Sequence, residues 1–143
     1  EYCLLEGCIE YVPGEKSADV IHSLEDAVRS ACEGDDWMLA HPPRVEWFGL
    51  LYEPAETGAN HPLVQLAEDC YESMLHKRPI VNGFEAGTDM RLLCNHFGVP
   101  GLMFGAGDIA LAHAPNEYVE LARLVEHAKV LALIMAKWCG VME

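Results

Sequence analysis

Residues 98–119 read GVPGLMFGAGDIALAHAPNEYV and combine a short apolar run, a glycine-rich turn and a histidine. The apolar run, Pro100–Phe104, predicts a buried strand. The loop Gly105–Asn116 follows it. The apolar spacing of Glu117–Cys139 then predicts the longest helix of the chain, which we expect to end at Gly140. A strand, a loop and a helix in this order are typical of an α/β layer.

The residues before this segment continue the alternation of helices and short strands. Asn60 is expected to cap a helix that has Pro62 in its first turn. An extended piece at Pro79–Val81 comes next. Thr88 and Asp89 can then cap a short helix, Met90–Phe97, that ends at Gly98.

The first third of the chain predicts a strand–helix–strand unit. Residues 2–11 alternate between apolar and polar positions, as a half-buried strand does. Ser17 is expected to cap a helix that stops at Gly34, and Arg44–Leu51 is rich in β-forming residues. Residues 53–59 have the composition of a linker or hinge.

Composition excludes several classes of protein. The 143 residues are 51% hydrophobic and 22% charged, which argues against disorder and collagen-like structure. A net charge of −14 would repel phosphate backbones, so we expect no nucleic-acid partner. The longest apolar run, Val130–Ala136, is too short to span a membrane. Six cysteines without a C-x-x-C pair favour buried free thiols and a cytoplasmic location.

The loop after the Pro100–Phe104 strand is the first candidate for a site. Its GAGDIA sequence matches a dinucleotide-binding fingerprint as text, but the following helix starts too late for that fold. We instead expect the backbone N–H groups of the glycines to face a site or an anion. His113 lies in the same loop, either as a ligand or as a histidine bonded to local backbone. One histidine does not make a zinc site, and the chain alone contains no obvious complete metal cage.

The turn Gly87-Thr88-Asp89-Met90-Arg91 is the second candidate. Free N–H groups at a helix start favour a carboxylate or an oxyanion, and Arg91 could hold it through two hydrogen bonds. The alternative is plain helix capping by Thr88 and Asp89, with Arg91 in solvent.

Three motifs in register resemble the C-terminal segment of one family. These are AGTDMRLL at 86–93, GVPGLMFGAGD at 98–108 and AHAPNEYV at 112–119. They closely resemble the acetylornithine deacetylase / succinyl-diaminopimelate desuccinylase family, whose members are zinc-dependent, aminoacylase- and carboxypeptidase-like metallohydrolases. VPGE at 12–15 and HPPRVEWFG at 41–49 resemble the end of that family's lid domain.

The resemblance implies a fold and a domain division. Residues 1–52 would be the β-α-β tail of a ferredoxin-like lid that carries the contact of a homodimer, and 53–59 would be the hinge. Residues 60–143 would be the C-terminal part of a phosphorylase/hydrolase-like α/β metallopeptidase domain. Because the chain starts at Glu1 rather than Met, we expect it to be a piece of a longer protein.

The resemblance also implies roles for individual residues. His113 would be a ligand in a site for two zinc ions, for which cobalt or manganese could substitute. Arg91 would bind the substrate carboxylate, with help from Thr88 and from the backbone of Gly105 and Gly107. The family's other ligands and its general base precede residue 1, so no catalytic residue is expected here and the isolated chain should be inactive.

The leading hypothesis is thus the C-terminal portion of a di-zinc amidohydrolase of amino-acid metabolism that removes acyl groups from N-acyl amino acids. One alternative is a non-catalytic dimerisation or binding module derived from this family. Another is a dipeptidase or carboxypeptidase of the same family. The expected partners are a small N-acyl amino acid or peptide and a second copy of the chain, with no membrane.

Overall fold

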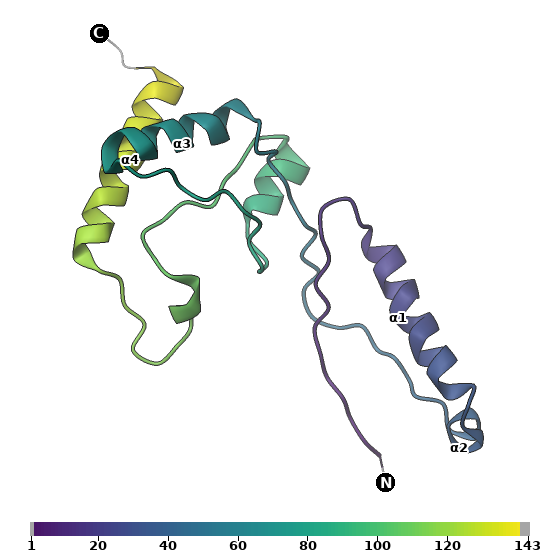
Figure 1. Ribbon diagram of the computed structural model, residues 1–143. Coiled ribbons are helices and arrows are strands. Elements are labelled where there is room, and N and C mark those ends of the chain that lie inside the picture. Colours follow the sequence, from purple (N-terminus) through teal and green to yellow (C-terminus); the bar gives the residue numbers. More distant parts are fainter. Residues whose placement is uncertain (1, 141–143) are drawn as a thin grey trace.

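The structure, a computed structural model, describes residues 2–140 and forms two lobes (Figure 1). Six helical segments occur in the order α1 (Ser17–Cys32), α2 (Asp36–Ala40), α3 (Pro62–Leu75), the π-helix η1 (Leu92–His96), the 3-10 helix η2 (Ile109–Leu111) and α4 (Leu121–Cys139). One lobe contains α1 and α2 together with the N-terminal segment, and the other contains the remaining helices. No strand is formed within residues 2–140.

The apolar core lies between α3 and α4. Ala67 and Cys70 on α3 pack with Val130 and Ile134 on α4, and all four are buried. Partly buried side chains surround this cluster: Leu66, Tyr71, Leu75, Leu102, Phe104 and Leu133. Leu102 and Phe104 come from the run that precedes the glycine-rich loop, so the core fixes where that loop begins.

The predicted helices are present, with shifted ends. His61 rather than Asn60 caps α3, because its Nδ1 accepts a hydrogen bond from the N–H of Leu63 at 3.1 Å. The last helix begins at Leu121 and not at Glu117, and the intervening residues are irregular. It ends before Gly140, as predicted.

Helix α2 is an element that the sequence analysis did not predict. Asp35 caps it, since its carboxylate accepts hydrogen bonds from the N–H groups of Trp37 at 2.8 Å and Met38 at 2.9 Å. The indole N–H of Trp47 donates to Glu25 on α1 at 3.1 Å. This bond links the segment that follows α2 to the first helix.

The predicted strands are not formed within residues 2–140, so the expected α/β layering and the β-α-β unit are not confirmed. Residues 2–11, 44–51, 79–81 and 100–104 have no ladder partner in the part of the chain that the structure describes. A strand is stabilised by hydrogen bonds to a neighbouring strand, and no such neighbour lies within residues 2–140, even for the run that carries Leu102 and Phe104 against the core.

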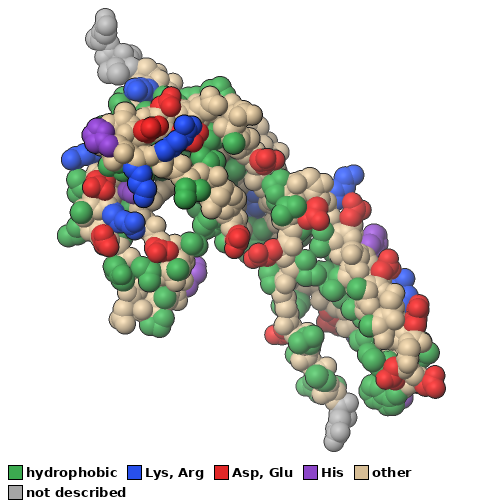
Figure 2. Space-filling view, viewed as in Figure 1, with side chains coloured by type: hydrophobic (Ala, Val, Ile, Leu, Met, Phe, Trp, Pro, Cys, Tyr) green, Lys and Arg blue, Asp and Glu red, His purple; other side chains and the backbone are tan. Residues whose placement is uncertain are grey.

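Apolar surface is left uncovered. The accessible surface is 11788 Å², whereas a compact monomer of 15.8 kDa would expose about 7,300 Å². Figure 2 shows apolar side chains at the surface of both lobes. The six cysteines are free thiols, as expected, but Cys3, Cys8 and Cys139 are exposed, so their predicted burial is wrong. No helix in residues 2–140 has the length and apolarity needed to cross a membrane.

Candidate functional site

The start of the short helix before the glycine-rich loop is built as the sequence predicts. The Thr88 hydroxyl accepts a hydrogen bond from the N–H of Met90 at 3.3 Å. Helical backbone runs over residues 90–97, with π-type turns from Leu92 to His96, and Gly98 ends it with a φ of 62°. Arg91 therefore lies in the first turn, and its backbone position is fixed by the cap.

The side chain of Arg91 is half-buried and lies over an aromatic ring. Its carbon Cζ is 4.7 Å from the centroid of the Tyr52 ring. The Nε atom is buried without a hydrogen-bond partner within residues 2–140. An unpaired buried N–H costs about 1–3 kcal/mol, so the Nε group lacks the hydrogen bond that would offset its burial.

Arg91 also differs from most other arginines of the chain in having no acidic partner. Arg29, Arg44 and Arg78 form ion pairs with Asp26, Glu46 and Glu68 respectively. Within the described residues Arg91 forms none, although the chain has 23 acidic residues and 9 basic ones. A guanidinium that stays without a carboxylate in such an acidic chain is available to an external anion.

The loop 105–116 holds His113 by its backbone and leaves the ring open. Asp108 accepts a hydrogen bond from the N–H of Ala110 at 3.0 Å and starts η2. His113 has a φ of 61°, and its N–H donates to the Glu117 carboxylate at 3.2 Å. The ring is exposed and has no hydrogen bond to residues 2–140. A left-handed backbone is uncommon at a non-glycine residue and occurs often at functional sites.

A metal ion would need more ligands than this part of the chain provides. Residues 2–140 contain no group of three or more His, Cys, Asp and Glu side chains that could hold a metal. The open imidazole of His113 has the donor chemistry that zinc prefers, but it is one ligand where a site needs three or four. His113 fits a metal centre only as a member of a larger ligand set.

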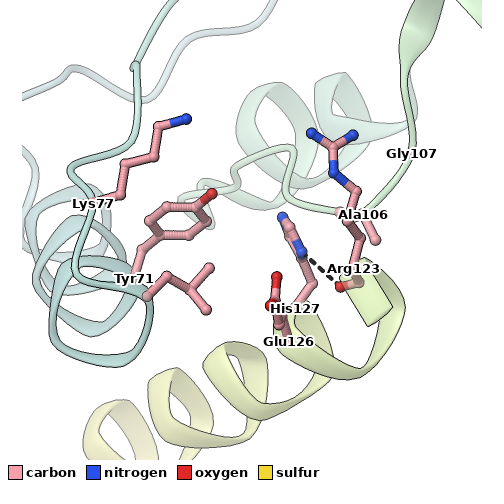
Figure 3. A pocket seen from close by; sticks show the side chains of 9 residues that line it. Tyr71, Lys77, Ala106, Gly107, Arg123, Glu126 and His127 are labelled. Carbon is pink, nitrogen blue, oxygen red and sulfur yellow. Dashed lines mark hydrogen bonds between the residues drawn. The ribbon is translucent and has the colours of Figure 1, made fainter. Parts of the chain in front are cut away.

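The two loop glycines lie in another place. Gly105 and Gly107 line a cavity of about 300 Å³ between the end of α3 and the start of α4 (Figure 3). Lys77 and Arg123 lie on opposite sides of it, with Tyr71 and His127 between them. The Nδ1 atom of His127 donates to the Arg123 carbonyl at 2.9 Å, drawn as a dashed line.

The candidate residues are therefore distributed over three places. Thr88 and Arg91 share the start of one helix, whereas Gly105 and Gly107 line the cavity. His113 lies in the exposed loop and is not among the residues that line the cavity. No local pattern in the sequence links Arg91 to Tyr52, its aromatic partner, so this contact could not be predicted. His127 was likewise not predicted, although Arg123 and His127 are one helical turn apart on α4.

Comparison with known protein families and curated proteins finds one matching family and several similar hydrolases. Residues 5–137 match the model of the peptidase family M20/M25/M40. The chain is 30% identical, over 145 residues, to an N-formyl-4-amino-5-aminomethyl-2-methylpyrimidine deformylase of Halalkalibacterium halodurans, covering 96% of this chain and 34% of that protein. The enzyme of the same name from Bacillus subtilis is 26% identical over 146 residues, with the same coverage.

A third similar protein comes from Pyrococcus abyssi and is named for LysW-lysine and LysW-ornithine hydrolysis. It is 30% identical over 100 residues, which are 69% of this chain and 29% of that protein. The chain thus spans about a third of the length of the curated relatives it matches. No solved structure matches it.

Proposed function

This chain belongs to the peptidase family M20/M25/M40, and we propose that it is the C-terminal portion of a metal-dependent amidohydrolase that acts on N-acyl amino acids. Within that family we infer that the function resembles that of acetylornithine deacetylase and succinyl-diaminopimelate desuccinylase. The relatives' names support cleavage of a C–N bond, since they describe a deformylase and a hydrolase.

The observation that carries this proposal is the unpaired guanidinium of Arg91. It lies on Tyr52 and has no acidic partner within residues 2–140. A planar guanidinium binds a carboxylate through two parallel hydrogen bonds, so Arg91 would select substrates with a free carboxylate. Thr88 would assist from the same helix start. Gly105 and Gly107 line a separate cavity in this structure, so their assistance through backbone N–H groups stays a prediction from the sequence.

His113 would supply one imidazole to the metal centre. The family is generally metal-dependent, and zinc is the metal we propose, with cobalt or manganese as substitutes. A bound metal would supply Lewis-acid polarisation of the amide carbonyl. The remaining ligands and the general base would come from outside residues 2–140, so the isolated chain should not turn over substrate.

The division of the chain is part of the same proposal. Residues 1–52 would close the lid domain, 53–59 would form the hinge and 60–143 would complete the catalytic domain. The lid would carry a homodimer contact, and the enzyme would act in the cytoplasm.

The test is a substrate panel with the full-length enzyme that contains this chain. N-acyl amino acids should release the free amino acid, and the corresponding α-carboxamides should be much poorer substrates. Dipeptides tested in parallel separate the deacylase from a dipeptidase or carboxypeptidase. Absence of hydrolysis with every amide would favour the non-catalytic module instead.

A second candidate function is removal of a formyl group from an aminomethylpyrimidine. It is favoured by the deformylase names of two relatives whose similarity extends over 96% of this chain. The named substrate contains an N-formyl group and no carboxylate, so Arg91 would not contribute to its selection. Adding this formamide to the panel decides between the two functions.

A further inference from the structure

We propose that Tyr52 is a positioning residue that orients Arg91 for the carboxylate of the substrate. This inference rests on the proposed function and extends it to a side chain outside the recognised motifs. Tyr52 lies at the end of the first predicted unit, whereas Arg91 lies in the second. Their contact is therefore made across the junction of the two units.

The junction segment, residues 53–59, is hydrogen-bonded to the helix that carries Arg91. The Pro54 carbonyl accepts a hydrogen bond from the Asn95 side chain at 3.1 Å. The Thr57 hydroxyl accepts one from the N–H of Gly101 at 3.0 Å, and Cys94 lies 3.7 Å from the same oxygen. Figure 1 shows this segment running beside η1. Tyr52 is thus presented to Arg91 by a segment that contacts both η1 and the residues just after it.

Gly87 leaves the space that the ring of Tyr52 occupies. A Cβ atom at Gly87 would lie 2.9 Å from Cγ and 3.0 Å from Cδ1 of Tyr52. Both distances are too short for carbon atoms, which pack best about 3.5–4.0 Å apart. The glycine of the Gly-Thr-Asp turn therefore allows the ring of Tyr52 to lie where it contacts Arg91.

The contact with the ring leaves N–H groups of the guanidinium free to bind an anion. The ring attracts the cation through its π-face, while a carboxylate binds to N–H groups in the plane of the guanidinium. The ring and a carboxylate therefore do not compete for the same atoms of Arg91. Tyr52 thereby limits the orientations of the Arg91 side chain before the substrate arrives, which reduces the entropy lost on binding.

The experiment compares an N-acyl amino acid with its α-carboxamide in the full-length enzyme. The quantity measured is the ratio of kcat/KM for the two substrates. Tyr52→Leu should lower this ratio roughly three- to tenfold, mainly through KM for the carboxylate. Tyr52→Phe retains the ring and should keep the wild-type ratio. Gly87→Ala should reproduce the loss with Tyr52 intact, which keeps the test decisive if Tyr52→Leu does not fold.

Tyr2→Leu is the matched control, because Tyr2 is an exposed tyrosine with no arginine contact in the described residues. Wild-type ratios in both Tyr52→Leu and Gly87→Ala would overturn the role of Tyr52. The proposed function would survive that result if Arg91→Ala still lost the preference for the carboxylate. A wild-type enzyme with no such preference would overturn both.

Discussion

Cys70 of α3 and Val130 of α4 are both completely buried, and they belong to one apolar cluster between these helices. The same cluster is flanked by Leu102 and Phe104, which directly precede the glycine-rich loop. The packing of two helices therefore sets the position from which the loop to His113 departs.

Val130→Ala should destabilise the full-length protein by about 2 kcal/mol, because it removes buried methyl groups and leaves a cavity. Denaturant unfolding measures the loss. The control is Val125→Ala on the same helix, where the side chain is 52% exposed and the expected change is below about 0.5 kcal/mol. Equal losses in the two variants would show that the α3–α4 core is not a centre of stability.

Arg91→Ala should raise KM for N-acyl amino acids about 10- to 100-fold, since a hydrogen-bonded charge pair contributes roughly 1.5–3 kcal/mol. Metal content, measured by elemental analysis, should not change. Arg29→Ala serves as a control, because that arginine is exposed and, within the described residues, forms an ion pair with Asp26 alone. Unchanged KM in Arg91→Ala would remove this residue from the substrate site.

His113→Ala should lower the metal content of the purified enzyme and reduce its activity in proportion. The imidazole of His113 forms no hydrogen bond to residues 2–140 and would be free to bind the metal. The substitution removes this ligand from the metal site. His22→Ala is the control, because His22 is exposed on α1 and its Nδ1 atom lies 3.8 Å from a carboxylate oxygen of Glu25. Full metal occupancy in His113→Ala would contradict the proposed role.

Removal of the metal by a chelator should abolish amide hydrolysis, and added zinc should restore it. Cobalt and manganese are expected to restore activity to different extents, because similar nitrogen and oxygen sites accept all three ions. Full activity after removal of every equivalent of metal would exclude a metal-dependent mechanism.

The helices could be predicted from the sequence because their apolar spacing is local. The periodicity that begins at Ser17 and the proline at position 62 located α1 and α3 closely, and Gly98 and Gly140 marked helix ends correctly. The residue that caps a helix was harder to predict from the sequence. The ring nitrogen of His61 caps α3, where Asn60 was expected.

The strands and the site could not be predicted in the same way. The alternation of residues 2–11 indicates which side chains would share a face, but a strand also needs a distant partner, and Leu5 remains 94% exposed. The motif around Thr88 and Arg91 can be recognised in the sequence, whereas the contact of Tyr52 with Arg91 depends on how the segment 53–59 folds back onto η1.

The most direct test of the proposed function is the specificity of the wild-type full-length enzyme. The quantities to measure are kcat/KM for an N-acyl amino acid, for its α-carboxamide and for the N-formyl aminomethylpyrimidine. An N-acyl amino-acid hydrolase with Arg91 in its substrate site should strongly prefer the substrate with a free carboxylate. Equal rates with the carboxamide, or a preference for the formamide, would rule out this function.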